Sequence, residues 1–253
     1  MKIVNVLFTG LGGHSSVVNA LVSAPGAEAY EWVAAYYGVA TIEPSHIVFC
    51  KKRGISYAVF HPKPRAPWNA WRKLAKWLIR ERPDAIICHS SVALPPCAWV
   101  CRLTRIPLIA VEHTPNEVKS KTEWLGSLAA MFVADRVVIL TNIYGQLLSD
   151  RLGSAYNHHK VRKIANGIST GFFYPNPSSK HFTETISTGM AGRLSPAKRQ
   201  DLLIDISYEL GVRLEIAGDG ECMTALRDRA LAYRNAPVTF CGSIPEADMP
   251  AWF

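Results

Sequence analysis

From residue 3 to about residue 151, short apolar runs alternate with segments of helical period, and this alternation constrains the fold more than any other feature. It predicts strands at 3–8, 31–36, 56–60, 84–88, 107–112 and 136–140, and helices near 14–23, 68–82, 92–104, 122–133 and 142–151. Strands of about five residues separated by helices indicate βαβ units and a parallel sheet. Because the runs are apolar throughout, we expect helices on both faces of that sheet.

The alternation pauses at 171–187 (GFFYPNPSSKHFTETIS), a segment with two prolines and no clean period, which indicates a linker. A second series follows, with strands expected at 187–191, 213–217 and 237–241, and helices at 197–210, at 221–233 and from 246. A doubly wound domain has about five or six strands. We therefore expect an α/β chain with a Rossmann-like domain over 1–170 and an incomplete Rossmann-like domain over 188–253.

Composition narrows the class of protein. The 49% hydrophobic content supplies a sizeable core, and six cysteines without a CxxC pair fit free thiols in a reducing cytosol. The N-terminal MKIVNVLFTG lacks the pattern of a signal peptide, and no run approaches the ~18–20 apolar residues of a membrane-spanning helix. These features predict a cytoplasmic protein, at most peripheral at the inner face of the membrane.

A glycine turn, GLGGH at 10–14, joins the first expected strand to the first expected helix. Free N–H groups at a helix N-terminus can hold phosphate, although such a turn can equally be purely structural. The dinucleotide fingerprint is absent, because Ser15 stands at its third glycine and Tyr36 and Tyr37 close the second strand without an acidic residue. The sequence therefore argues against NAD binding.

A second cluster, AGRLSPAKRQDLL at 191–203, places Arg193 and Lys198 around a Ser-Pro turn where a helix is expected. Two cations beside a helix N-terminus would suit a diphosphate; the alternative is two solvated basic residues around a cap. Glycine turns also follow the next two strands, AGDGE at 217–221 and FCGSIP at 240–245. Three such loops are expected at the carboxyl edge of one sheet, where α/β folds bind ligands.

The order GRLSPAKRQDLL, LEIAGDGE and VTFCGSIPEADMPAWF resembles the second domain of the retaining group 1 (family four) glycosyltransferases. The first half is also similar to that family, in GLGGHSSVVNAL, RPDAIICHS, VEHT and VVILTNIYGQLL…VRKIANGIS. The resemblance implies a GT-B fold, in which two Rossmann-like domains hold the donor in the cleft between them. It also implies transfer of a sugar from a nucleotide-diphosphate sugar to a hydroxyl with retention, in cell-surface polysaccharide or lipid-linked glycan synthesis.

The same resemblance implies residue roles. Arg193 and Lys198 would hold the nucleotide diphosphate, and His113 would be the catalytic-site histidine near the donor sugar, with His89 ranked below it. The other donor-binding positions lie in the glycine-bearing loops: Gly12, Gly13, Gly218, Gly220, Cys241, Gly242 and Ser243. No metal and no cofactor are expected, because the two cations take the metal's part in stabilising the departing diphosphate.

The family's second domain continues past the segment that matches PAWF with an acidic motif of two glutamates, which this chain does not reach. We therefore expect a truncated form of doubtful activity. Two alternatives remain open: a non-catalytic remnant that binds a nucleotide or a partner, and a nucleotide-sugar epimerase of the same architecture.

The stretch 51–105 holds twelve Lys and Arg residues but only two acidic ones, which favours an anionic partner. Within it, the expected helix at 68–82 combines tryptophans with basic residues, as helices at membrane surfaces do. The candidate membrane or acceptor patch consists of Trp68, Trp71, Arg72, Lys73, Lys76, Trp77 and Arg80. The alternative is a crossover helix that packs its apolar stripe on the sheet and shows Lys and Arg to water. No nucleic-acid-binding module is recognisable, so the expected partners are a nucleotide-sugar donor, a glycan or lipid-linked acceptor, and a peripheral membrane contact.

Overall fold

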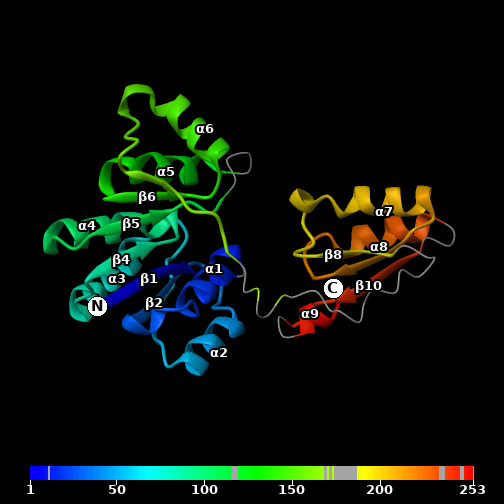
Figure 1. Cartoon of the computed structure of the whole chain (residues 1–253), viewed down its shortest axis with the longest axis horizontal. Coiled ribbons are helices and arrows are strands. Elements are labelled where there is room, and N and C mark those ends of the chain that lie inside the picture. The colour runs from blue at the N-terminus through cyan, green and yellow to red at the C-terminus, as the bar shows by residue number, and fades with distance from the viewer. Residues whose placement is uncertain are drawn as a thin grey trace. The chain divides into compact units, whose positions relative to one another are not determined.

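The chain forms two compact units, Met1–Ile168 and Ser169–Phe253, each of α/β architecture (Figure 1). The structure is a computed structural model that describes residues 1–10, 12–114, 119–167, 170, 173, 187–233, 237–245 and 248–252. Most of the expected linker at 171–187 lies outside the described residues, and Ser187 already opens the first strand of the second unit.

The first unit is built on a parallel sheet with the strand order β3-β2-β1-β4-β5-β6-β7. Its strands are β1 (Lys2–Phe8), β2 (Glu31–Tyr37), β3 (Ser56–Phe60), β4 (Ala85–Cys88), β5 (Leu108–Val111), β6 (Arg136–Ile139) and β7 (Val161–Lys163). The first six agree with the sequence prediction. β7 was not among the predicted strands because it is a short edge strand whose residues, VRK, are half-buried or exposed and carry no apolar run.

Helices connect these strands and cover the sheet: α1 (Gly13–Val22), α2 (Pro44–Arg53), α3 (Trp68–Glu81), α4 (Leu94–Thr104), α5 (Lys121–Val133) and α6 (Asn142–Leu152). The sequence did not predict α2. This helix starts on a proline at its first position and ends at Gly54 in the left-handed conformation, but it buries only His46 and Cys50 among its own residues. It therefore lacks the apolar stripe by which a helix is recognised in a sequence.

The core lies on both faces of the sheet, as the apolar strands require. On one face Val4 and Val6 of β1 pack in a cluster that includes Leu74 and Leu78 of α3. On the other face Leu7 packs with Val18 of α1 and a second set of side chains from β2 and α2. Successive side chains alternate across a strand, so Asn5 shares the face of Leu7.

In its described part, the second unit has a parallel sheet of order β10-β9-β8, formed by β8 (Ser187–Ala191), β9 (Arg213–Ala217) and β10 (Val238–Gly242). Its helices are α7 (Gln200–Leu210), α8 (Met223–Ala232) and α9 (Met249–Trp252). The core consists of Leu194, Ile204, Leu214, Ile216 and Leu226.

The helix predicted from residue 197 begins three residues later. Pro196–Lys198 form a 3-10 turn, and Arg199 then adopts a left-handed conformation with φ of 53°, which separates this turn from α7. Ser195 precedes the turn, but its side chain makes no capping hydrogen bond. Arg193 therefore precedes a 3-10 turn that ends with Lys198, and neither cation lies in the first turn of a long helix.

Candidate functional site

The strand order of the first unit indicates the edge at which a ligand crevice is expected. β1 lies between β2 and β4, so the chain runs outward in one direction through β2 and β3 and in the other through β4. In parallel α/β sheets such a switch point opens a crevice at the carboxyl ends of the strands. The residues at this edge are the loop after Phe8, His89 after β4, and the Glu112–Thr114 segment after β5.

Four histidines from four different segments gather here. The Nδ1 atom of His89 and the Nε2 atom of His113 are 2.8 Å apart, and the two rings stack with centroids 5.1 Å apart. The ring of His14 meets His113 edge-on at a centroid distance of 6.2 Å, and the ring of His46 lies 6.3 Å from His14. We call these four residues the histidine cluster; the sequence had singled out His113 and ranked His89 below it.

Burial keeps the histidine cluster neutral at pH 7. The pKa of His113 is lowered to about 4, chiefly by burial and secondly by His14, while Glu112 opposes the shift. Burial, followed by the charges of His113 and His14, lowers the pKa of His89 well below its usual value. The pKa values of His14 and His46 are also lowered, chiefly by burial. Although the rings lie close together, no group of three His, Cys, Asp or Glu side chains within the described ranges is arranged to hold a metal ion.

The two glycines before α1 have different local roles. Gly12 is the N-cap of the helix, and a Cβ atom there would lie 2.6 Å from Nδ1 of His14, so a side chain would displace that ring. Gly13 is exposed, and a Cβ atom there would meet nothing within 4 Å. Gly12 therefore makes room for the histidine cluster, whereas Gly13 presents open backbone beside it. Leu11 lies outside the described residues.

A buried ion pair fixes the strand end that carries His113. The Nζ atom of Lys119, with a side chain 1% exposed, donates to Oε2 of Glu112 at 2.8 Å and to Oγ of Ser127 at 2.7 Å. Ser127 and Tyr144 also donate to the same carboxylate oxygen, at 2.7 and 2.9 Å. The hydroxyl of Tyr144 further contacts the carbonyl of Thr114. These contacts tie the segment around His113 to α5 and α6, and sequence reasoning had missed them.

In the second unit, glycines line the carboxyl edge of the sheet because its loops approach one another closely. Gly218 and Gly220 have φ of +138° and +158°, and Cβ atoms there would lie 2.0 Å from the carbonyl oxygen of Gly192 and 2.3 Å from that of Leu194. The N–H of Gly218 also donates to the carbonyl of Gly242 at 2.6 Å. The three loops after β8, β9 and β10 therefore meet at one edge.

Charged and polar side chains stand at the same edge. The guanidinium of Arg193 donates to Oε2 of Glu221 from Nε at 3.3 Å and from Nη2 at 3.1 Å, and both side chains are largely exposed. Lys198 lies in the exposed 3-10 turn. Cys241 and Ser243 are exposed on either side of Gly242, and Sγ of Cys241 lies 3.9 Å from Oε2 of Glu215. The structure thus brings the predicted donor-binding residues of this unit to one edge.

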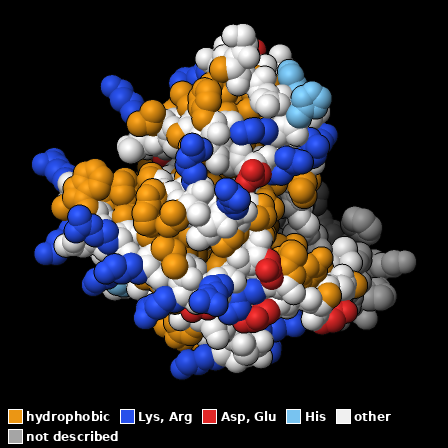
Figure 2. Space-filling view, turned by 90° about the vertical axis from the view of Figure 1, so that its left-hand side faces the viewer, with side chains coloured by type: hydrophobic (Ala, Val, Ile, Leu, Met, Phe, Trp, Pro, Cys, Tyr) orange, Lys and Arg blue, Asp and Glu red, His pale blue; other side chains and the backbone are white. Residues whose placement is uncertain are grey.

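The candidate membrane patch divides into a buried and an exposed part. Trp71 and Trp77 pack against the core, together with the buried Leu74 and Leu78 of the same helix. Trp68 is 61% exposed. The basic members are exposed: Arg72, Lys73, Lys76 and Arg80. The face on the left of Figure 1, where α3 and α4 lie, shows many Lys and Arg side chains interspersed with apolar ones (Figure 2).

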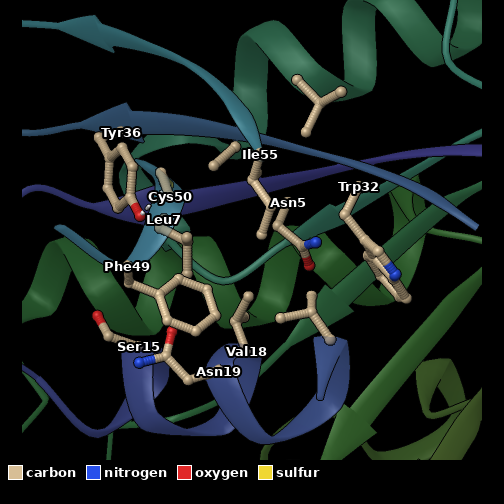
Figure 3. Close-up of a pocket in the computed structure, with 13 residues that line it drawn as sticks. Asn5, Leu7, Ser15, Val18, Asn19, Trp32, Tyr36, Phe49, Cys50 and Ile55 are labelled. Atoms are coloured by element: carbon tan, nitrogen blue, oxygen red, sulfur yellow. Dashed lines mark hydrogen bonds between the residues drawn. The ribbon is translucent and has the colours of Figure 1, made fainter. Parts of the chain in front are cut away.

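A small cavity in the first unit is not a ligand site. It lies under the sheet between β1, β2 and α1, where Asn5, Ser15, Val18 and Tyr36 are among its lining residues (Figure 3). Its volume of about 10 Å³ is that of a single water molecule. A sugar or nucleotide cannot enter it, and the candidate site is the edge that carries the histidine cluster.

Solved structures show that the fold is that of GT-B glycosyltransferases. HepE from Anabaena in complex with UDP-glucose is similar with a TM-score of 0.78 and 20% identity, over 97% of this chain and 70% of that chain. The lipopolysaccharide outer core galactosyltransferase WaaB is similar with a TM-score of 0.65 and 16% identity, over 96% and 68%. Sucrose-phosphate synthase from Thermosynechococcus elongatus is similar with a TM-score of 0.71 and 14% identity, over 100% and 73%.

The sequence assigns the family within this class. The model of Glycosyltransferase Family 4 matches residues 12–172, more than half of the chain, and the chain belongs to this family. None of the curated proteins matches it significantly. Across the described ranges, no helix has the length and apolarity needed to cross a membrane.

Proposed function

We propose that this protein transfers a sugar from a nucleotide-diphosphate sugar to a hydroxyl acceptor with retention of the anomeric configuration. The observation that carries the proposal is the placement of the histidine cluster at the switch point of the sheet, within the segment that matches Glycosyltransferase Family 4. A neutral, buried imidazole at such a crevice suits an uncharged sugar hydroxyl. HepE, whose fold is similar, binds UDP-glucose in its solved structure.

The second unit supplies the groups that the proposal needs for the diphosphate. In the transfer, the bond between the anomeric carbon and the diphosphate oxygen breaks, and a bond to the acceptor oxygen forms on the same face of the sugar. The acceptor's proton leaves with the nucleoside diphosphate. Arg193 and Lys198 would stabilise the negative charge that develops on the departing diphosphate, as cations do in such sites. Arg193 would exchange its exposed partner Glu221 for the phosphate.

Donor binding is the first test, with UDP-glucose as the probe and calorimetry as the measurement. A charged hydrogen bond contributes about 1.5–3 kcal/mol, so Arg193→Ala should weaken binding at least tenfold. The control is Arg213→Ala, because Arg213 is exposed at the first position of β9, at the opposite end of that strand. Equal affinities for the two variants would reject the role of Arg193.

The reaction is tested with UDP-glucose and a lipid-linked or glycan hydroxyl acceptor, with the anomeric proton of the product followed by NMR. Retention predicts that the product has the anomeric configuration of the donor, and the opposite configuration would reject it. Formation of an epimeric nucleotide sugar without any acceptor would instead indicate the epimerase. Binding without either reaction would indicate a non-catalytic nucleotide-binding protein.

We further propose that the acceptor is reached at a membrane surface through α3 and α4. These helices pack against each other, and apolar side chains stand out from both, with Trp68 61%, Trp99 58% and Leu103 62% exposed. The same two helices carry exposed basic residues: Arg72, Lys73, Lys76 and Arg80 on α3, and Arg102 and Arg105 at the end of α4. Exposed tryptophan beside Lys and Arg is the combination that binds the interface of anionic membranes.

Liposome sedimentation tests this contact. Binding should be stronger to vesicles of phosphatidylcholine with phosphatidylglycerol than to phosphatidylcholine alone, and it should weaken with salt. Each Lys or Arg near the surface contributes about 1 kcal/mol, so changing Arg72, Lys73, Lys76 and Arg80 to Gln should lower binding to the anionic vesicles by about a thousandfold. Equal binding to the two kinds of vesicle, or none to either, would remove the membrane contact from the proposal.

A further inference from the structure

Three side chains of the first unit, one from β1 and two from the segments that follow β4 and β5, form a continuous series of hydrogen bonds. Asn5 of β1 is 1% exposed, and its Oδ1 lies 3.1 Å from Nε2 of His89. On the other side of the same ring, Nδ1 of His89 lies 2.8 Å from Nε2 of His113. Both nitrogens of His89 are therefore engaged, one by an amide and one by the next histidine.

The amide oxygen of Asn5 determines which atom donates and which accepts in each of these hydrogen bonds. An amide oxygen only accepts hydrogen bonds, so Nε2 of His89 carries the proton and donates it to Asn5. A neutral imidazole carries a single proton, which leaves Nδ1 of His89 as an acceptor. Nε2 of His113 must then donate to it. The remaining ring nitrogen of His113, Nδ1, is left with a lone pair.

The surroundings favour the neutral form that this argument requires. Burial lowers the pKa of both His89 and His113, so neither ring is protonated at pH 7. The other two rings of the cluster carry their proton on the same ring nitrogen. Nε2 of His14 lies 3.3 Å from the carbonyl oxygen of Phe8, and Nε2 of His46 lies 3.3 Å from that of Gly10. A carbonyl oxygen only accepts, so these rings also carry their proton on Nε2.

We propose that Asn5 and His89 are positioning residues that hold His113 in its Nε2–H tautomer, so that Nδ1 of His113 accepts a hydrogen bond from a hydroxyl of the donor sugar. The recognition of a sugar hydroxyl rests on the proposed function. The tautomer itself is a property of the protein without ligand. In this arrangement Asn5 acts on the ligand through two rings and touches no substrate.

The tautomers are read directly by long-range ¹H–¹⁵N NMR spectra of protein labelled at histidine nitrogens. At pH 7.5, His89 and His113 should each show one protonated nitrogen, Nε2, and one unprotonated nitrogen, Nδ1. A proton on Nδ1 of His113 would overturn the proposal, because it would mean that the amide of Asn5 donates to His89 and that the chain runs in reverse. Exchange between both tautomers of His113 would also overturn it.

A variant tests whether Asn5 is the residue that fixes the tautomer of His113. Asn5→Leu keeps the approximate shape of the side chain but removes the acceptor, and both tautomers of His113 should then be populated. The control is Asn19→Leu, because Asn19 lines the same small cavity from α1 (Figure 3). Asn19→Leu should leave the tautomer of His113 unchanged. A single Nε2–H tautomer of His113 in folded Asn5→Leu would assign the order to another group and reject the role of Asn5.

Titration with UDP-glucose then tests whether the tautomer of His113 matters for ligand binding. Addition of UDP-glucose should shift the Nδ1 resonance of His113. If the two tautomers become equally populated, half of the Asn5→Leu molecules are competent to bind, and the dissociation constant should rise about twofold relative to Asn19→Leu. Binding with an unmoved Nδ1 resonance would refute recognition of a hydroxyl by His113. A complete lack of UDP-glucose binding would instead reject the proposed function, whereas the spectra of the free protein would still decide the tautomer.

Discussion

Acid should destabilise the first unit through its histidine cluster. At pH 7.5 a histidine with the ordinary pKa of 6.5 is neutral in the unfolded chain, and the buried rings are neutral in the folded chain, so folding changes no proton binding. Below pH 6.5 the unfolded chain binds protons that His89 and His113 do not take up in the folded state. Stability must then decrease as the pH falls, because protonation favours the unfolded chain.

The size of the loss follows from the two pKa values. For His113 the pKa falls from 6.5 in the unfolded chain to about 4 in the folded chain. At pH 5.5 linkage gives a loss of about 1.4 kcal/mol for a ring that stays neutral in the fold, and thus about 2.8 kcal/mol for His89 and His113 together. The lowered pKa values of His14 and His46 add to the loss in the same direction. For His113 alone the loss approaches about 3.4 kcal/mol below pH 4.

Urea unfolding at pH 7.5, 6.5 and 5.5 measures this loss through tryptophan fluorescence, which reports on the first unit because six of the seven tryptophans lie there. The control is His113→Asn, which should lose about 1.4 kcal/mol less than the wild type between pH 7.5 and 5.5. Carboxylates titrate alike in both proteins, so the difference isolates His113. A free energy of unfolding that is flat over this range, or an identical loss in the variant, would refute the reasoning.

Three further predictions concern other contacts. Lys119→Met should lower the free energy of unfolding by about 3–5 kcal/mol because it leaves Glu112 buried without its counter-ion. The double variant with Glu112→Gln should recover part of that loss in urea unfolding, and equal losses in the single and double variants would contradict a buried pair. Trp77→Ala should cost about 3–5 kcal/mol in unfolding free energy, and Trp68→Ala, at an exposed position of the same helix, should cost far less; comparable losses would mean that Trp68 is buried. Glu221→Ala should tighten UDP-glucose binding a few-fold in calorimetry by releasing Arg193, and weaker binding would indicate that Glu221 itself contacts the donor.

Much of the fold could be predicted from the sequence because the parallel strands are buried on both faces and therefore consist of apolar residues. The six strands predicted for the first unit and the three predicted for the second are present in the structure. The sequence did not predict α2 and β7, because these two elements do not bury a run of apolar residues. The buried side chains of α2 are His46 and Cys50, and β7 is an edge strand with exposed charges.

The site could be predicted only in part, because its geometry depends on the order of the strands. The sequence placed His113 at a strand end, but the contact between Asn5 and His89 joins residues 84 positions apart. It exists because β4 pairs with β1, and no local pattern encodes that pairing. Lys119 was equally hidden, since a lysine after a strand is ordinarily solvated and nothing near it in the sequence indicates that its ammonium group is buried.

The end of β5 shows why a charged pair and an uncharged cluster occur side by side. Glu112 and His113 are neighbours in the chain, yet Glu112 contacts Lys119 and α5, whereas His113 contacts His89. An unpaired carboxylate beside His113 would favour the protonated ring, and Glu112 does raise the pKa of His113. Lys119, at 2.8 Å from that carboxylate, offsets its field. The ion pair therefore anchors the strand end to α5 and allows the adjacent imidazole to remain neutral. The neutral ring is the state that the proposed hydrogen bond from a sugar hydroxyl requires.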